Sequence, residues 1–258
     1  MCADVRFEDG SSYEQMMGVW SRIVGEPFIN WLAPAPGADW VDVGCGTGAF
    51  TELIVEKAAP RSVVGLDPSP AQVDYAQQTR GGGPARFAVG DGMALPLADA
   101  SVDQATSALV LFFIPDPAKG VSEMVRVTRP GGMVSSYLWD IPGGNFAYRH
   151  MNEAMAAEGF EAMRPPRWEV AELGALTALW RDAGLRDIAT DVIEPERVYE
   201  NFDAYWRLAT TTPVIAPVLA RMPPETLARV QDRLRDTLAA GDGPVRIRAR
   251  AHAIKGRR

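Results

Sequence analysis

"VDVGCGTGAF", residues 41–50, is the stretch of sequence that decides the fold. An apolar run ending at Val43 precedes its glycines and a helical pattern follows from Ala49, so a tight turn must join a strand to a helix. Glycine adopts backbone conformations that other residues avoid, and it lets a ligand approach the main chain closely. Free amide groups at the start of the following helix favour an anion or another acceptor. The stretch therefore predicts a ligand-binding loop at the end of a parallel strand.

The spacing of small residues in this loop fits two cofactors. Gly44, Gly46 and Ala49 satisfy the G-x-G-x-x-G/A pattern of a dinucleotide-binding turn. Gly44, Gly46 and Gly48 of the same loop give the tighter G-x-G-x-G pattern of an S-adenosylmethionine loop. Asp42 stands two residues before the first glycine, where a carboxylate would repel a pyrophosphate and attract the ammonium group of a methionyl moiety. This position favours S-adenosylmethionine.

Two further carboxylates are expected at the ends of the next two strands. Asp67 lies 19 positions after Gly48 and can accept hydrogen bonds from a ribose, which both cofactors carry. Asp91 can accept from an adenine amino group, and Met93 can pack on the ring. An adenosine held between these strand ends, with an amino acid on the first loop, describes the methyl donor.

The chain outside the loop alternates short apolar runs with helical patterns between residues 39 and 140, which is typical of βα units. The pattern predicts strands at 40–43, 62–67, 85–91, 102–113 and 132–140, and helices at 49–58, 70–78 and 119–128. Beyond residue 140 it predicts helices at 147–160 and 170–183. A strand pair, or one long strand interrupted at Pro195, is expected at 187–199, followed by a helical stretch broken by prolines at 202–240. The leading segment, 13–32, is amphipathic and could pack over the carboxyl ends of the strands.

Composition excludes several classes of protein. With 47% hydrophobic and 23% charged residues the chain is of ordinary globular type, so disorder of the whole chain is excluded. No apolar run approaches the roughly 18 residues of a membrane span, and the acidic start does not suit a signal peptide, so we expect a cytoplasmic protein with no membrane partner. Cys2 and Cys45 provide neither a disulfide framework nor a metal cage, and we expect no metal.

The end of the chain, RIRARAHAIKGRR, is basic although the net charge of −7 argues against a general nucleic-acid binder. It carries six Lys and Arg residues and no acid, but small or apolar residues occupy every second position from Val245 to Ala253. That period predicts a strand with one buried face and a basic solvent face. An RNA-contacting tail is the alternative.

The chain resembles the class I S-adenosylmethionine-dependent methyltransferases, and most of all their small-molecule group that includes quinone-biosynthesis enzymes. The resemblance rests on VDVGCGTG at 41–48, VVGLDPSP at 63–70, GDGMALPLADASVD at 90–103, IPDP at 114–117 and EMVRVTRPGG at 123–132. It implies an α/β fold: a Rossmann-like, seven-stranded, mostly parallel sheet with the last strand antiparallel, helices on both faces and helical lid insertions. The whole chain, 1–258, would be a single methyltransferase domain: cap helices in 1–38, a cofactor-binding core in 39–140, lid inserts in 141–169 and 201–243, and the final antiparallel strand in 244–258.

The resemblance also implies site residues and partners. The donor would be S-adenosyl-L-methionine, the product S-adenosyl-L-homocysteine, and the acceptor a small, apolar or aromatic molecule, with the protein a monomer or homodimer. The residues expected around the donor are Asp42, Gly44, Cys45, Gly46 and Gly48, then Asp67 and Pro68, then Asp91, Gly92 and Met93, then Ser107 and Leu109 beside the sulfonium, and Tyr13, Trp20 and Arg22 from the leading segment.

Candidates for acid–base catalysis are few. Many relatives carry a histidine just before the PDP turn, where this chain has Phe112, Phe113 and Ile114. His150 in a lid helix and Asp140 at the end of the fifth strand are the remaining candidates. Methyl transfer mainly needs an acceptor atom held in line with the sulfonium and shielded from water, so a base is not essential. Three alternatives stay open: an RNA methyltransferase, an NAD-dependent oxidoreductase, and a donor-binding protein without transfer activity.

Overall fold

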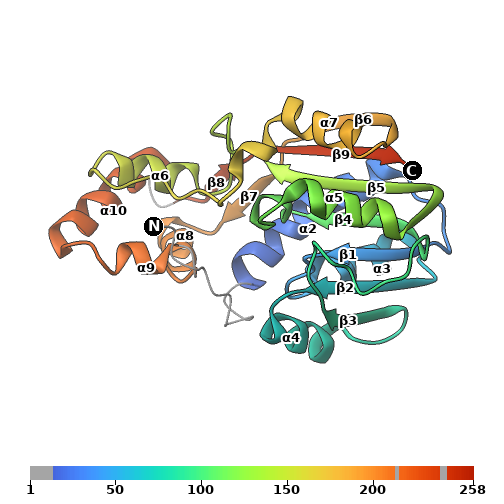
Figure 1. The fold of residues 1–258 in the computed structure, drawn as a ribbon. Coiled ribbons are helices and arrows are strands. Elements are labelled where there is room, and N and C mark those ends of the chain that lie inside the picture. The colour runs from blue at the N-terminus through green and yellow to red at the C-terminus, as the bar shows by residue number, and fades with distance from the viewer. Residues whose placement is uncertain (1–13, 213–214, 239–242) are drawn as a thin grey trace.

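The computed structural model of the protein describes residues 14–212, 215–238 and 243–258, except for the side chains of Gln15 and Met16. One large sheet organises this part of the chain (Figure 1). Its strands are β1 (Asp39–Val43), β2 (Ser62–Asp67), β3 (Ala85–Val89), β4 (Val102–Ala108), β5 (Thr128–Trp139), β6 (Arg186–Ile193) and β9 (Ala251–Arg257). A small separate sheet pairs β7 (Glu196–Tyr199) with β8 (Val245–Arg248).

Helices cover both faces of the large sheet. The N-terminal cap consists of a π-helical turn, η1 (Glu14–Gly18), and α2 (Val19–Leu32). The remaining helices are α3 (Ala49–Ala58), α4 (Pro70–Arg80), α5 (Pro117–Val127), α6 (Arg149–Ala156), α7 (Leu173–Asp182), α8 (Phe202–Thr210), α9 (Ala216–Leu219) and α10 (Pro224–Leu238), with short 3-10 turns η2 (Leu111–Phe113) and η3 (Trp168–Ala171). No helix in these described ranges is long and apolar enough to cross a bilayer.

The strand order is β3-β2-β1-β4-β5-β9-β6. The first five strands in this order run parallel, and β9 runs antiparallel to both β5 and β6. This arrangement confirms the predicted Rossmann-like sheet and places the last strand of the chain inside the sheet rather than at its edge. Because β1 is central and parallel to its neighbours, its carboxyl end opens at the edge where such sheets bind ligands.

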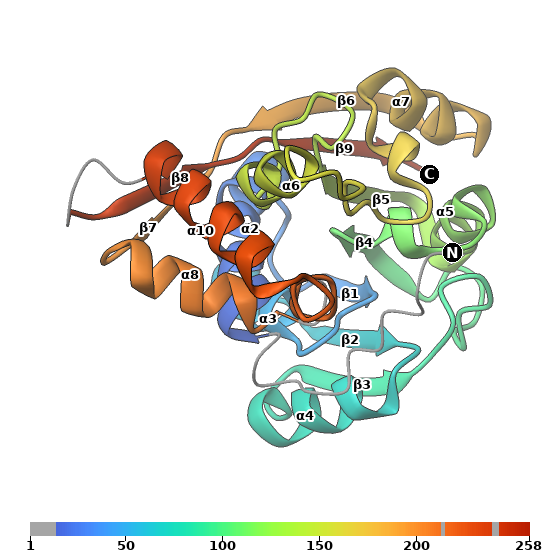
Figure 2. The same ribbon diagram turned by 90° about the vertical axis from the view of Figure 1, so that its left-hand side faces the viewer.

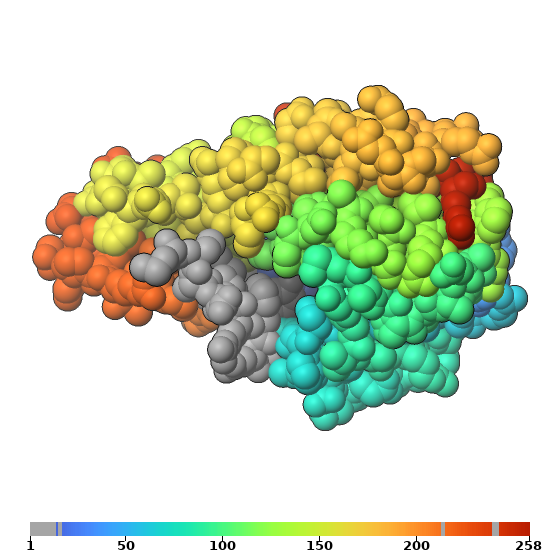
Figure 3. All heavy atoms as spheres, viewed as in Figure 1, coloured from blue at the N-terminus to red at the C-terminus, as the bar shows by residue number. Residues whose placement is uncertain are grey.

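Part of the chain after β5 lies at that carboxyl edge, whereas α7, β6 and β9 belong to the sheet body. In Figure 1, α6, α8, α9 and α10 with the β7–β8 pair project beyond the end toward which β5 points, and Figure 2 shows α6, α8 and α10 in front of the sheet. The space-filling view shows the same segments as a narrower extension of the broader sheet body (Figure 3). We name α6, α8, α9, α10, β7 and β8 the lid.

Two segments differ from the prediction. The fourth strand ends at Ala108 instead of continuing to residue 113, because Leu109 takes a left-handed conformation (φ 61°) and donates its N–H to the Tyr137 carbonyl at 2.9 Å. The basic C-terminal segment forms two strands, because Ala249 and Arg250 donate their N–H groups to Pro195 and Asn145 and leave the ladder there.

The alternation predicted for the C-terminal segment is confirmed. Val245, Ile247, Ala249, Ala251 and Ala253 are all buried. On the solvent side, the arginines at 246 and 248 pair with Glu196, and the arginine at 250 pairs with Glu194. These ion pairs engage three of the six basic side chains of the segment, and Lys255, Arg257 and Arg258 donate to backbone carbonyls.

Candidate active site

The glycine loop between β1 and α3 is bound to the end of β2. Gly44, Gly46 and Gly48 all have positive φ angles, of 77°, 53° and 83°. The N–H groups of Gly44 and Cys45 donate to the Leu66 carbonyl at 2.7 and 3.0 Å. A Cβ on Gly44 would lie 2.4 Å from a methyl group of Val110, so only glycine fits there. The loop is therefore held against the ends of both β2 and β4.

Asp42 lies fully buried on β1 beneath this loop. Its Oδ2 accepts a hydrogen bond from Thr51 Oγ1 of α3 at 2.7 Å, while its Oδ1 has no partner among the described residues. Thr106 lies opposite Asp42 on β4, and its buried hydroxyl is likewise without a described partner. Burial raises the pKa of Asp42 to about 7, the Thr51 hydrogen bond opposes the rise, and the charge of Asp67 adds to it.

Asp67 ends β2 with both carboxylate oxygens oriented by backbone amides. Its Oδ2 accepts the Gly46 N–H at 3.0 Å and its Oδ1 accepts the Ser69 N–H at 2.9 Å. Burial raises the pKa of Asp67, and these two amide hydrogen bonds oppose the rise. Pro68 follows at the exposed mouth of the site. Each oxygen keeps one lone pair for a further donor.

Asp91 and Met93 lie in the connection that follows β3. The exposed Asp91 accepts the Met93 N–H through Oδ1 at 2.8 Å, and its carbonyl accepts the Ala94 N–H at 3.0 Å. Gly92 packs closely beneath the turn, since a Cβ there would lie 3.1 Å from Ile114 and 3.3 Å from Val43. The turn thus presents a carboxylate and a thioether beside the ends of β1 and β2.

A cavity lies between the glycine loop and the cap. It is lined by Gly18, Ser21, Asp42, Gly44, Cys45, Gly46, Thr47, Ala49, Phe50 and Ala108. Its volume is about 20 Å³, which holds about one water molecule. Burial raises the pKa of the Cys45 thiol, so this residue contributes a neutral wall. A larger ligand at this spot requires the cap to move away.

Several residues expected at the site lie elsewhere. Trp20 is fully buried and packs edge-to-face on Trp139, with ring centroids 5.5 Å apart. Arg22 pairs with Glu52 and Glu56 of α3. Both belong to helix faces that turn away from the cavity, whereas Gly18 and Ser21 face it.

The structure also refines the expectations at the end of β4 and at the N-terminus. Ala108 lines the cavity, while Ser107 and Leu109 flank it and are buried. Ser107 is one of the buried hydroxyls without a hydrogen-bond partner in the described part of the chain. Tyr13 lies outside the described residues.

The sequence analysis missed Glu14, Thr47 and Arg80, which close the cap onto the loop. Thr47 Oγ1 donates to Glu14 Oε2 at 2.6 Å, and Arg80 Nη2 donates to Glu14 Oε1 at 2.7 Å. Arg80 also donates to the Thr47 carbonyl at 2.8 Å and pairs with Glu52. These contacts join η1, the glycine loop, α3 and α4, and we name the Glu14–Thr47–Arg80 group the latch.

Glu14→Gln is expected to loosen the cap, because it removes the charge that Arg80 contacts. A partly buried ion pair of this kind contributes roughly 1 kcal/mol, so amide hydrogen exchange across residues 14–21 should become about fivefold faster. Glu26→Gln is the matched control, because it breaks the Lys57 pair that joins α2 and α3. Equal exchange in the two variants would show that the latch does not hold the cap.

The two candidate catalytic residues are connected but do not line the cavity. Asp140 is buried and closes a turn: Oδ1 accepts the Gly143 N–H at 2.8 Å, and Oδ2 accepts from Asn145 Nδ2 at 3.3 Å. Arg149 links the Asn145 amide oxygen to His150 Nε2. Burial lowers the pKa of His150, so its imidazole is neutral at pH 7. The Asp140 carboxylate therefore accepts hydrogen bonds within its own turn, and His150 belongs to the lid.

The chain was compared with protein-family models and with proteins of known sequence. Residues 41–136 match the family model described as "Methyltransferase domain". A demethylmenaquinone methyltransferase of Desulfitobacterium hafniense is 42% identical over 113 residues, which cover 42% of this chain and 45% of that protein. A malonyl-acyl-carrier-protein O-methyltransferase of Serratia marcescens is 35% identical over 113 residues, covering 44% of this chain and 43% of that protein. The chain thus spans less than half the length of either relative.

The fold was also compared with solved structures. The YcgJ protein of Bacillus subtilis matches with a TM-score of 0.59 at 18% identity, over 91% of this chain and 97% of that one. The matched residues 41–136 contain the glycine loop, Asp67 and the Asp91 turn, so motif, strand order and overall fold agree. Residues 41–136 are similar to a methyltransferase domain, and the chain has the fold that the resemblance implies. The resemblance inferred from the sequence is confirmed at this level.

Proposed function

We propose that the protein is an S-adenosylmethionine-dependent methyltransferase that acts on a small, apolar or aromatic molecule. The observation that carries this proposal is Asp42 Oδ1, a buried oxygen without a described partner on a residue that lines the cavity. A buried carboxylate oxygen is costly unless a donor reaches it. The ammonium group of a methionyl moiety would supply both the hydrogen bond and the opposite charge.

The neighbouring residues fit the rest of the donor. The free lone pairs of Asp67 suit the two ribose hydroxyls, and the two backbone amides already fix the carboxylate in place. The exposed Asp91 suits the adenine amino group, with Met93 beside the ring. Gly44 and Gly46 let the methionyl part lie against the backbone. In this proposal the whole chain is one methyltransferase domain, in which 141–169 and 201–243 cover the acceptor.

When bound, S-adenosylmethionine supplies an electrophilic methyl group on a sulfonium. The chain's task is then to hold the acceptor atom in line and to exclude water. The cap and the lid are suited to excluding water, because Tyr148 at the start of α6 donates its hydroxyl to Met17 Sδ of η1 at 3.0 Å. We assign no general base, because the Asp140 carboxylate accepts hydrogen bonds within its turn and His150 Nε2 accepts from Arg149.

Apolar side chains of the cap and of the segments after β5 suit an acceptor of this chemical class. Phe146 is buried, and Met17, Trp168 and Trp206 are half-buried against the same core. Such surfaces suit an apolar or aromatic molecule held by few polar contacts. The names of the two relatives, which specify demethylmenaquinone and a malonyl group on acyl-carrier protein, widen the acceptors worth testing to quinols and carboxylates.

Titration calorimetry with S-adenosylmethionine, followed by an assay for S-adenosylhomocysteine with a panel of phenols, quinols, amines and carboxylic acids, tests the proposal. We expect saturable donor binding and acceptor-dependent product. Absence of binding at millimolar donor would overturn the proposed cofactor. Donor binding without turnover on any acceptor would favour the donor-binding protein, and tryptophan quenching by NADH but not by S-adenosylhomocysteine would favour the oxidoreductase.

A further inference from the structure

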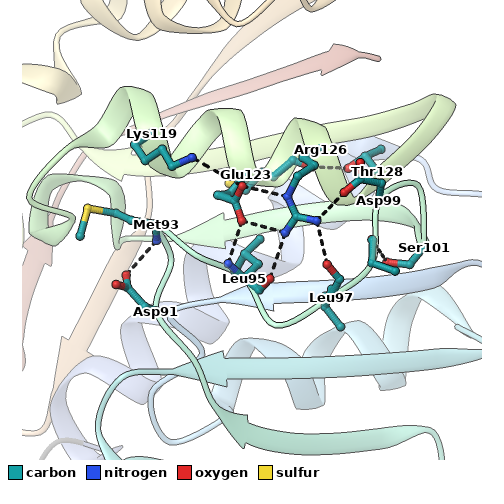
Figure 4. A network of polar contacts seen from close by, with 12 residues as sticks. Asp91, Met93, Leu95, Leu97, Asp99, Ser101, Lys119, Glu123, Arg126 and Thr128 are labelled. Carbon is teal, nitrogen blue, oxygen red and sulfur yellow. Dashed lines mark hydrogen bonds and ion pairs between the residues drawn. The ribbon is translucent and has the colours of Figure 1, made fainter.

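The connection between β3 and β4 has almost no regular structure of its own. Within residues 90–101 the only backbone pairing of strand type is a single bridge between Asp91 and Ala94. Backbone hydrogen bonds to the end of α5 hold Ala100 and Ser101, and side chains from outside hold the part of the connection that precedes them. Figure 4 shows that these come from α5, where Glu123 and Arg126 project onto the connection.

Arg126 binds three acceptors along this connection. Its guanidinium donates to the carbonyls of Leu95 and Leu97 at 2.9 and 2.8 Å, and to Asp99 Oδ1 at 2.7 Å. In Figure 4 the guanidinium lies between these groups and Glu123. A planar fork of five donors is the one side-chain group that can satisfy such a set together.

Glu123 completes the arrangement from the same helix. Its side chain is 9% exposed, and its two oxygens accept from Arg126 Nε and Nη2, both at 2.8 Å. Oε2 also accepts the Leu95 N–H at 2.9 Å. The hydrogen bonds from Arg126 hold the pKa of Glu123 below its usual value, so the pair stays charged. The N–H and the carbonyl of Leu95 are thus both hydrogen-bonded to the Glu123–Arg126 ion pair.

The bound Leu95 is only four residues from Asp91. Between them, Met93 and Ala94 donate their N–H groups back to Asp91, and Gly92 packs on Ile114 just before α5. Little backbone freedom remains in this turn once Leu95 is fixed. In Figure 4 the Asp91 carboxylate faces the Met93 N–H at the end of the connection farthest from Arg126.

We infer that Glu123 and Arg126 are positioning residues for adenine recognition, acting through the Leu95 peptide to orient Asp91 and Met93. The inference rests on the proposed function, in which Asp91 accepts a hydrogen bond from the adenine amino group. It assigns to the ion pair a role in ligand discrimination beyond that of stabilising a surface helix. Neither residue touches the donor.

The test compares binding of S-adenosylhomocysteine with that of S-inosylhomocysteine, in which a carbonyl replaces the amino group of the base. A carboxylate built to accept from that amino group should make the native protein prefer the adenine compound by about tenfold or more. In Arg126→Ala this preference should fall to within about threefold, because Asp91 is no longer held in place. Arg126→Lys, whose ammonium cannot bridge the same acceptors, should fall between the two.

Two further variants separate positioning from folding. Glu123→Gln keeps an acceptor for the Leu95 N–H and should retain part of the preference even if Arg126→Ala fails to fold. Lys119→Ala is the matched control on α5, since Lys119 is exposed and lies 3.8 Å from Glu123. It should leave the preference unchanged.

Each outcome decides between the claims. Equal losses of affinity for both compounds in the Arg126 and Glu123 variants, with the preference intact, would overturn the positioning role while leaving the proposed function standing. A native protein that binds both compounds equally would overturn the role of Asp91, and with it this inference. A native protein that binds neither compound would overturn the proposed function itself.

Discussion

Asp67→Ala is expected to lower the affinity for S-adenosylmethionine by about 100-fold or more. The ribose hydroxyls would lose two charge-assisted hydrogen bonds to the Asp67 carboxylate. Each hydrogen bond to a charged group contributes roughly 1.5–3 kcal/mol. The variant also removes the acceptor of the Gly46 N–H, so the glycine loop loses one of its attachments to β2. Titration calorimetry at fixed pH and salt measures the change directly.

Asp67→Asn distinguishes the two contributions of this residue. An asparagine keeps one carbonyl oxygen for the Gly46 amide but loses the charge and one ribose acceptor. We therefore expect a loss of affinity smaller than that of Asp67→Ala. Asp74→Ala, which removes an exposed carboxylate of α4, is the control and should leave binding unchanged. Unaltered affinity in both Asp67 variants would exclude Asp67 from donor binding.

The sequence was sufficient to predict the sheet, and it placed the candidate site at the carboxyl edge of that sheet. Short-range signals carried that prediction: the glycines after Val43 require a turn, and an acid at the end of a parallel strand must lie at the carboxyl edge. The alternation from Val245 to Ala253 likewise predicted one buried face. Such signals repeat with the period of the local structure, so they need no knowledge of distant contacts.

Contacts between distant segments could not be predicted in this way. The latch joins residues 33 and 66 positions apart, and nothing in the local sequence of Glu14 indicates Thr47 or Arg80. The side-chain directions in the cap depend on how α2 lies on α3, which is why Trp20 turned into the core and Gly18 toward the cavity. Glu123 and Arg126 belong to the motif EMVRVTRPGG, but their hydrogen bonds to Leu95 could be found only in the structure.

Asp42→Asn should change stability and donor binding in opposite directions. Burial raises the pKa of Asp42 from an ordinary 3.8 to about 7, so the folded protein binds a proton more tightly than the unfolded chain does. The contribution of Asp42 to stability is therefore fully present below about pH 4, is lost as the pH rises from about 4 to 7, and does not change above that range. The cost at pH 8 is on the order of a few kcal/mol, and the uncharged asparagine avoids it while still accepting from Thr51. Thermal unfolding at pH 5 and pH 8 should show the variant gaining several degrees over the native protein at pH 8 and a smaller amount at pH 5, where only part of the cost is present.

Donor affinity should follow the ionisation of the same carboxyl group. Only the carboxylate can counter the ammonium of the methionyl moiety, so the affinity of the native protein should rise up to tenfold per pH unit toward pH 7 and then level off. In Asp42→Asn this dependence should disappear, and affinity at pH 8 should be about 10- to 100-fold lower. Calorimetry across pH 5.5–8.5 on both proteins provides the measurement, with buffers matched in ionic strength. A native protein with pH-independent affinity over this range would show that the orphan Oδ1 does not contact the donor. The buried charge costs the folded protein stability, and on this account it persists because donor binding requires it.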